Sequence, residues 1–465
     1  MADAFEPASF RDRTARVFRR DGLVYRALSE QAQREWQQLS ATRFFRRRQD
    51  DGSLVATEPL ASAEAAEGLS GGPWVAVLKH ETIPFVSYPY EWCFGMLRGA
   101  ARLQLDLLLE ALDEGMVLKD ASAYNVQWRG SQPVFIDIGS FERLAPGEPW
   151  VGYRQFCQLF LYPLMLQAYR DLAPHAWLRG SLDGVPPGDC RRMMSARDLL
   201  RRGVLTHVVL QAKAEARYGG SGKNMRAELK RAGFGVDLIR ANVRRLKALV
   251  DGLTWEADRS TWSEYATEHG YGTEDQERKT RFVAAVAGAR RWPLVWDLGC
   301  NTGRFTRVAA DHADCVVALD ADQLAIERLY RALAAEGNRT ILPLVGNLAD
   351  PSPALGWRGR ERVPLGDRGT PDLALCLALI HHLVISANIP LLDLLDWLAA
   401  LGADLVIEFV DRGDPMVQRL LLNKADQYYD YDRAVFESGL SARFRVVRSE
   451  RLGSGTRFLY HATRR

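Results

Sequence analysis

The chain has few of the features that cross-link or anchor other proteins. Its 465 residues include six cysteines without C-x-x-C spacing, which argues against a disulfide framework or zinc site and favours reduced thiols. Apolar stretches such as 156–169 are too short and too interrupted to span a bilayer. Residues 1–22 contain no apolar core, so we expect no secretory signal and predict a cytoplasmic protein.

Net charge is also small, at +3, but it is unevenly distributed. Residues 191–247 contain fifteen Lys and Arg and only four Asp and Glu, whereas 255–277 is acidic. A basic block of this kind can bind phosphates or a polyanion. We favour a solvated helical face packed near the acidic connector, because no aromatic-interleaved basic strand supports nucleic acid as a partner.

The composition, with 47% hydrophobic and 26% charged residues, is that of a globular protein, and the length predicts two or three domains. From residue 291 onward, strands and helices alternate. We expect helices at 303–313, 322–337 and 389–402, and strands at 293–299, 315–320, 341–347, 372–379, 403–409, 444–452 and 456–463. This alternation predicts a Rossmann-like α/β fold with a mainly parallel seven-stranded sheet, whose ligands bind at the carboxyl ends of the strands.

Glycines and polar residues stand at these strand ends. The stretch VWDLGCNTGRF (295–305) places Gly299 and Gly303 after the first strand, while Asp320 ends the second strand and Asn347 the third. Glycines let the backbone approach a ligand closely. A carboxylate at the end of the second strand can accept both hydroxyls of a ribose. A short amide after the third strand is placed to hydrogen-bond an adenine edge.

In these residues the segment 291–465 resembles the class I S-adenosylmethionine-dependent methyltransferases. DLGCNTGRF is similar to their D/E-x-G-x-G-x-G motif, with Asn301 in place of the middle glycine, and ALDAD, GNLAD and LALIHHL resemble their later motifs. An NAD(P)-binding domain is the competing interpretation, but residues 301 and 304 are not glycine. The resemblance implies S-adenosylmethionine as cofactor, with the binding residues Asp297, Gly299, Cys300, Asn301, Gly303, Asp320, Ala321, Asn347 and Leu348.

Two side chains are candidates for catalysis of methyl transfer. His381 and His382 follow the fourth strand, and we predict that His382 is the exposed one and acts as general base toward a hydroxyl acceptor. Glu408, expected at the end of the fifth strand, is the second candidate. The segment 411–432 is either a wall of the acceptor site or an ordinary capped helix. Upstream, Trp262, Tyr265 and Tyr271 belong either to a lid or to packing against the sheet.

The N-terminal half contains a second group of polar residues. Asp120 and Asn125 stand five residues apart, and Asp137-Ile138-Gly139 follows two short strands around an Arg-Gly-Ser turn. Phosphoryl transfer needs a carboxylate that orients the acceptor hydroxyl and oxygen ligands for magnesium. Asp120 suits the first role, and Asn125 and Asp137 suit the second.

This pattern resembles the catalytic and metal-binding loops of protein kinases and their small-molecule phosphotransferase relatives, over about residues 84–167. The resemblance implies an α+β kinase-like domain that uses ATP and Mg²⁺. The histidine usual before Asp120, a G-x-G-x-x-G loop and a V-A-I-K lysine are absent. We expect Arg26, with Glu30 or Glu35, to imitate the family's lysine–glutamate pair at the nucleotide.

The predicted organisation is a small kinase-like lobe at 1–84, a helical lobe at 85–254, a connector or lid at 255–290 and the methyltransferase domain at 291–465. The whole is similar to bacterial methyltransferases described as nodulation-protein-like. We predict an enzyme of the EC 2.1.1 class that methylates, on oxygen, a glycan or small-metabolite acceptor after phosphorylating it. The alternatives are a methyltransferase with an ATP-binding or inactive pseudokinase scaffold, a nucleotide-sensing binding protein, and an RNA methyltransferase.

Overall fold

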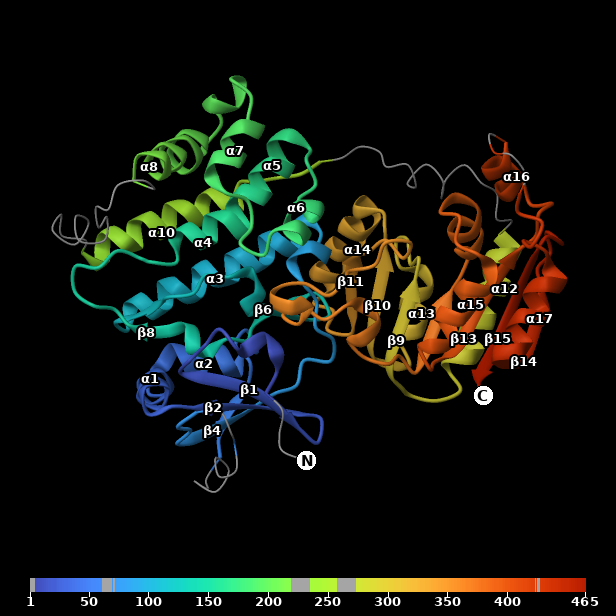
Figure 1. The fold of residues 1–465 in the computed structure, drawn as a ribbon, viewed down its shortest axis with the longest axis horizontal. Coiled ribbons are helices and arrows are strands. Elements are labelled where there is room, and N and C mark those ends of the chain that lie inside the picture. Colours follow the sequence, from blue (N-terminus) through green and yellow to red (C-terminus); the bar gives the residue numbers. More distant parts are fainter. Residues whose placement is uncertain are drawn as a thin grey trace. The chain divides into compact units, whose positions relative to one another are not determined.

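The structure, a computed structural model, describes residues 5–60, 69, 72–218, 235–256, 273–422, 424 and 427–465. The chain divides into two compact units (Figure 1). Unit 1 consists of Met1–Trp128, Pro133–Glu256 and Ala354–Arg362, and unit 2 of Arg129–Gln132, Ala257–Pro353 and Val363–Arg465. The expected lid residues Trp262, Tyr265 and Tyr271 lie outside the described residues.

Unit 1 begins with an antiparallel four-stranded sheet in the order β1-β2-β4-β3. Its strands are β1 (Ala15–Arg20), β2 (Leu23–Leu28), β3 (Thr57–Pro59) and β4 (Ala76–His80). Asp21 and Gly22 both have positive φ, as a two-residue hairpin turn with the twist of its strands requires. After β2, the Ser29 side chain accepts a hydrogen bond from the Ala32 N–H and starts α1 (Glu30–Ser40), which α2 (Arg43–Asp50) follows.

The rest of unit 1 is mainly helical and packs around α3 (Phe94–Asp113), a helix in which most residues are buried and most of the buried ones are apolar. Two short hairpin-like strand pairs follow it, β5 (Met116–Leu118) with β8 (Phe141–Arg143), and β6 (Val126–Arg129) with β7 (Gln132–Phe135). The other helices of this part are α4 (Tyr153–Phe156), α5 (Tyr162–Arg170), α6 (His175–Gly180), α7 (Pro187–Met193), α8 (Leu210–Tyr218) and α10 (Val236–Asp251). Short 3-10 and π segments are η1 (Pro7–Ser9), η3 (Pro89–Glu91), η4 (Ala123–Asn125), η5 (Ile138–Ser140), η6 (Cys157–Leu161), η7 (Arg197–Leu200) and η8 (Val204–Val209).

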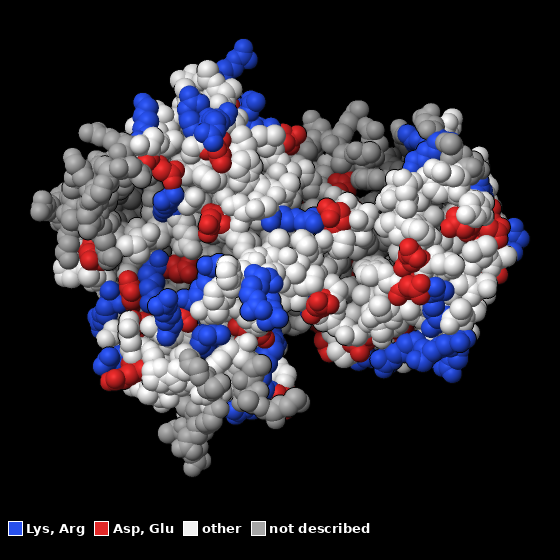
Figure 2. All heavy atoms as spheres, viewed as in Figure 1, with Lys and Arg blue, Asp and Glu red and all other residues white. Residues whose placement is uncertain are grey.

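Four basic side chains in the described part of the stretch 191–247 form ion pairs, Arg192, Arg201, Arg240 and Lys247. In α10, Arg240 lies 2.9 Å from Asp113 and Lys247 lies 3.5 Å from Asp106, both on α3. Among the described residues, α3 therefore supplies acidic partners to α10, whereas most of the acidic connector lies outside the described ranges. Figure 2 likewise shows Lys and Arg interspersed with Asp and Glu over the visible face of unit 1.

Unit 2 contains a seven-stranded sheet in the order β11-β10-β9-β12-β13-β15-β14. The five strands β9 to β13 run parallel, and β15 pairs antiparallel with both β13 and β14. The strands are β9 (Trp292–Leu298), β10 (Ala313–Asp320), β11 (Ile341–Val345), β12 (Leu373–Cys376), β13 (Asp404–Val410), β14 (Phe444–Arg451) and β15 (Arg457–Arg464). Each expected strand of 291–465 is therefore present.

The helices of unit 2 include one that sequence analysis missed, α17 (Arg433–Arg443), which the Asp432 side chain caps. The expected helix 303–313 is shorter, ending at Ala310. The remaining elements are α12 (Thr273–Ala287), α13 (Arg304–Ala310), α14 (Gln323–Glu336), α15 (Leu391–Ala400), α16 (Pro415–Leu421), η10 (Leu365–Asp367) and η11 (His382–Ser386). The short segment η9 (Trp357–Gly359) belongs to unit 1.

The strand order creates a switch point between β9 and β12. From β9 the chain crosses outward through α13 and α14 to β10 and β11, and it then returns to the other side of β9 as β12. Right-handed crossovers in opposite directions put the connecting helices on opposite faces of the sheet. The loops that leave β9 and β12 therefore diverge at the carboxyl ends of these strands, which is where open α/β sheets bind their ligands.

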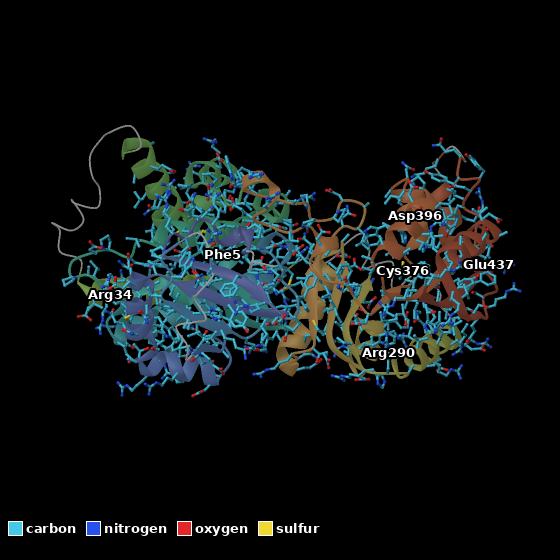
Figure 3. All side chains as sticks on the ribbon, turned by 60° about the horizontal axis from the view of Figure 1, so that its bottom comes forward. Phe5, Arg34, Arg290, Cys376, Asp396 and Glu437 are labelled. Carbon is cyan, nitrogen blue, oxygen red and sulfur yellow. The ribbon has the colours of Figure 1, made fainter. Side chains whose placement is uncertain are left out.

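The interior of unit 2 is apolar, and its charged groups lie mostly outside. Cys376 of β12 is fully buried in the sheet, whereas Asp396 projects from α15 (Figure 3). Asp396 binds Arg443 of α17, with 2.6 Å between Oδ1 and Nε. No disulfide joins the six cysteines, all of which are described and buried.

Residues 354–362, between β11 and β12, belong to unit 1, which sequence analysis did not anticipate. Within unit 1, Glu361 accepts two hydrogen bonds from the Arg11 guanidinium, and Arg362 lies 3.9 Å from the ring centroid of Tyr124. Over the described ranges, no helix combines the length and apolar character that crossing a bilayer requires.

Candidate functional site

The loop after β9 has a backbone that only a few residue types tolerate. Gly299, Asn301 and Gly303 have φ of +80°, +49° and +81°. A Cβ atom added at Gly303 would lie 2.6 Å from Leu329 Cδ1, so no side chain fits there. The loop is therefore held in one shape at the switch point, with bare backbone at two positions.

Asp320 connects the tips of the first three strands. Its Oδ2 accepts the Asn301 N–H at 2.7 Å, its Oδ1 accepts the Asp322 N–H at 2.8 Å, and its backbone oxygen accepts the Gly346 N–H at 2.9 Å. Burial raises the pKa of the Asp320 carboxyl, although these N–H donors oppose that effect. Each carboxylate oxygen still has a lone pair for a ligand hydroxyl.

The other expected cofactor contacts surround Asp320. Asn347 is exposed, and its Oδ1 accepts the Ala349 N–H at 3.0 Å, which holds the amide beside the tip of β11. Ala321 is exposed and Leu348 half-buried. Cys300 is buried, and burial raises the pKa of its thiol well above the ordinary range, so it contributes as a small apolar side chain.

Asp297 lies beneath this loop and holds it. The carboxyl is 2% exposed, and its Oδ2 accepts the Thr306 hydroxyl of α13 at 2.5 Å. Burial raises the pKa of Asp297 to about 7, the Thr306 hydrogen bond opposes the shift, and the nearby Asp320 adds to it. Two carboxyls that repel one another at these strand ends favour a ligand with positive charge. Together, the strand-tip residues fit S-adenosylmethionine.

The histidine pair follows β12, at the opposite side of the switch point. His381 is 1% exposed, and neither of its ring nitrogens has a hydrogen-bond partner among the described residues. His382 is half-buried, so it is less buried than His381 without being the exposed side chain that the sequence-based prediction described. Burial, together with Arg457, lowers the pKa of His382 to about 4. A base of that strength lies far from the optimum for proton abstraction near neutral pH.

Glu408 is not accessible as the sequence-based hypothesis required. β13 continues past it to Val410, and its side chain is 0% exposed. The Glu408 Oε2 lies 2.6 Å from the Nζ of Lys279 on α12, and Arg457 Nη1 lies 3.6 Å from Oε1. Glu408 is therefore an ion-paired core residue in this arrangement, which corrects its expected role as a free base. Lys279 was missed, because its position in an amphipathic helix does not reveal a partner on a distant strand.

The segment after β13 contains the capped helix that one interpretation predicted. The Asp414 side chain accepts the Met416 N–H at the start of α16 and also binds Arg457 Nε at 2.7 Å. Beyond α16, Lys424 and Tyr428 donate hydrogen bonds to the Ile385 carbonyl in η11. The segment therefore also lies against the turn that carries His382.

In unit 1 the three residues of the kinase-like pattern lie close together. The Asn125 amide donates to the Ser140 hydroxyl at 3.2 Å, and that hydroxyl donates to Asp137 Oδ2 at 2.5 Å. Asp120 accepts the Ser122 N–H at 2.9 Å. Burial and the charge of Asp137 raise the pKa of Asp120.

Arg26 does not pair with a glutamate of α1, contrary to our expectation. Its Nη1 lies 2.8 Å from Asp137 Oδ1, while Glu35 binds Lys119 at 3.2 Å and Glu30 binds Arg34 at 3.1 Å. Burial raises the pKa of Asp137, but the Arg26 charge and the hydrogen bonds from Ser140 and Arg26 together outweigh burial, so the net pKa is lowered. Arg26 is thus the partner of the carboxylate that was predicted to bind metal.

The residues of unit 1, as arranged, do not fit Mg²⁺. Both oxygens of Asp137 are engaged, one by Arg26 and the other by Ser140. Throughout the described residues, no group of three or more His, Cys, Asp or Glu side chains has an arrangement that would hold a metal ion. The predicted ligands Asn125 and Asp137 are instead joined to each other through Ser140, and their role as metal ligands stays a prediction.

The sheet and its strand-tip residues define a Rossmann-like α/β domain. No protein-family model matches the chain. The chain is 34% identical over 455 residues to the nodulation protein NoeA of Rhizobium meliloti (strain 1021), and the match covers 97% of this chain and 94% of that protein. The chain therefore belongs to the NoeA nodulation protein family.

Several solved structures show a distant likeness. The N-methyltransferase NodS of Bradyrhizobium japonicum WM9 is 12% identical, covers 41% of this chain and 97% of its own, and has a TM-score of 0.30. Magnesium protoporphyrin IX methyltransferase of Synechocystis PCC 6803, with bound S-adenosylmethionine, is 16% identical and covers 44% and 92%, also with a TM-score of 0.30. Monomeric WbdD is 19% identical, covers 44% of each chain and has a TM-score of 0.28. Likenesses at this level do not assign an activity to this chain.

Proposed function

We propose that unit 2 is an S-adenosylmethionine-dependent methyltransferase of the EC 2.1.1 class. The observation that carries the proposal is the arrangement around Asp320, whose carboxylate joins the glycine-rich loop to the second strand tip at the switch point. The order of the motifs in the sequence supports it, as does the antiparallel β15 inserted next to β13. The cofactor, when bound, supplies an electrophilic methyl group.

In this proposal each strand tip binds one part of the cofactor. Asp320 accepts the ribose hydroxyls and Asn347 hydrogen-bonds the adenine edge. The bare backbone at Gly299 approaches the methionine part, and Asp297 keeps that loop in place through Thr306. Methyl transfer is an in-line displacement, so holding the two reactants at the correct distance supplies most of the rate enhancement.

The acceptor in our proposal is a glycan or small metabolite, methylated on oxygen. His382 lies beside the switch point and stays neutral near pH 7, because its pKa is lowered to about 4. We assign it the task of accepting a hydrogen bond from the acceptor hydroxyl, which orients one oxygen lone pair toward the methyl group. The hydroxyl proton is then lost to water after the methyl group has been transferred. Glu408 holds Lys279 and Arg457 in position, and the charge of Arg457 in turn helps to lower the pKa of His382. We retain a cytoplasmic location as part of the proposal.

The test is calorimetric titration of S-adenosylmethionine into the full chain and two variants. We expect wild type to bind one equivalent and Asp320→Ala to bind at least about tenfold more weakly, since it loses charge-assisted hydrogen bonds worth about 1.5–3 kcal/mol each. Asp314→Ala, which removes an exposed carboxylate of β10, should match wild type. Wild type that binds NADH instead, or binds neither compound, would overturn the proposal.

A coupled reaction, phosphorylation of the acceptor by unit 1 followed by methylation, is the sequence-based alternative. It needs Asp120 to orient the acceptor hydroxyl and Asn125 with Asp137 to bind Mg²⁺ under ATP. The Arg26–Asp137 ion pair favours an inactive scaffold that helps to hold the acceptor. RNA methylation has weak support, because the sequence has no RNA-binding signature and two basic residues of α10, Arg240 and Lys247, are paired with α3.

A further inference from the structure

The closest charge to the predicted metal ligand in unit 1 is a side chain of unit 1 itself. Arg26 projects from β2 and is 8% exposed, and its Nη1 lies 2.8 Å from Asp137 Oδ1. Its Nε has no hydrogen-bond partner among the described residues. Burying a hydrogen-bond donor without a partner costs free energy. The burial of Arg26 is therefore compensated by the attraction between its charge and Asp137.

The second oxygen of Asp137 is also occupied. Ser140 donates to Oδ2 at 2.5 Å, and the same hydroxyl accepts from Asn125, so the two predicted metal ligands are joined by a serine. Mg²⁺ in proteins is bound through one or two carboxylates with oxygen ligands at about 2.0–2.1 Å and keeps several waters. Such an ion would have to share Asp137 with the guanidinium, whose positive charge repels it.

A second cation lies near these loops. Lys119, next to Asp120 in the chain, lies 3.2 Å from Glu35 of α1 and 3.7 Å from Glu142. Its charge also helps to lower the pKa of Asp137, after the larger effect of Arg26. The negative charge of Asp137 is therefore compensated by side chains of the protein.

We propose that Arg26 is a built-in cation that takes the place of a divalent ion at Asp137, so that unit 1 holds neither Mg²⁺ nor a magnesium–nucleotide complex at the Asp120–Asn125–Asp137 loops. Unit 1 is then a metal-independent module, and removing the guanidinium charge opens a cation site. This inference concerns unit 1 alone and stands or falls independently of methyl transfer by unit 2.

The experiment uses Mn²⁺ as the probe, alone and with ATP, and counts bound ions by electron paramagnetic resonance on the full chain. Wild type and Asp137→Asn should bind Mn²⁺ equally, because Asp137 is not a ligand. Arg26→Gln keeps a hydrogen-bond donor without the charge and should gain one site of at least about tenfold higher affinity than any in wild type. The double variant Arg26→Gln/Asp137→Asn should lose that site.

Arg26→Lys is the matched control, because it keeps a positive charge at the same position and should gain no site. Wild type that binds one Mn²⁺, with or without ATP, and loses it in Asp137→Asn would overturn the proposal. A folded Arg26→Gln variant that binds no more Mn²⁺ than wild type would do the same. If Arg26→Gln does not fold, the comparison of wild type with Asp137→Asn decides the question.

Discussion

The buried ion pair between α12 and β13 gives the sharpest stability prediction. Lys279 and Glu408 are 2% and 0% exposed, with 2.6 Å between Nζ and Oε2. Lys279→Met keeps the length of the side chain and removes its charge, which leaves Glu408 as a buried carboxylate. Breaking a buried pair from one side costs about 3–5 kcal/mol. Arg457, 3.6 Å from the other oxygen, compensates in part, so we expect a loss near 3 kcal/mol.

The double variant Lys279→Met/Glu408→Gln separates this charge effect from packing. Burial lowers the pKa of Lys279, and Glu408 offsets only part of that effect. Each charge therefore mainly compensates the cost of burying the other, and the intact pair adds little net stability. The double variant should therefore recover about 2 kcal/mol of the loss caused by Lys279→Met alone, as a coupling energy in a double-mutant cycle.

Urea unfolding is monitored by hydrogen exchange in peptides from α12 and β13. This measures the free energy of unfolding for unit 2 by itself. The exposed pair Arg307–Glu336, with side chains 40% and 47% exposed, is the control. Glu336→Gln should leave the free energy of unfolding unchanged within the error of the measurement, because water and salt screen an exposed pair. A loss for Lys279→Met as small as that of the control, or strictly additive effects in the cycle, would refute the reasoning.

Two further predictions concern the strand-tip loop. Because the folded pKa of Asp297 is raised to about 7, the folded state binds a proton that the unfolded state releases above about pH 4. The free energy of unfolding should therefore fall as pH rises from 5 to 7 and level off above it. Asp297→Asn should flatten this dependence, and a wild-type stability that rises over that range would contradict the assignment. Gly303→Ala places a Cβ 2.6 Å from a leucine side chain at φ +81°, whereas Gly337→Ala, at φ +65°, meets no atom within 4 Å. Thermal unfolding should show that Gly337→Ala lowers the free energy of unfolding by about 1 kcal/mol and that Gly303→Ala lowers it clearly more. Equal losses for the two variants would count against a crowded loop.

The strand ends and the loop motif of unit 2 were readable from the sequence because they depend on neighbours along the chain. Apolar runs bounded by Gly, Asp and Asn specify where β9, β10 and β11 end, and these ends carry Gly299, Asp320 and Asn347. The helix α17 was missed, although Asp432 gives it an ordinary cap. Its sequence lies next to a segment whose charged and aromatic residues were interpreted as a site wall.

Partner choice was not readable, because a long charged side chain can reach any of several groups. Arg26 was expected to bind Glu30 or Glu35, its neighbours in sequence, and it binds Asp137 instead. Glu408 was expected to be free, yet its burial forces a pairing with Lys279.

The sequence by itself determined the order of strands and helices, the bare glycines of the β9 loop and the acid that follows β10, since each is a property of a few adjacent residues. Only the tertiary structure decided which charges are compensated, how far burial shifts the pKa values of Asp297 and His382, and that residues 354–362 pack into unit 1. Those properties depend on the groups that folding brings within a few ångströms and on the water it removes, and neither is encoded by spacing along the chain.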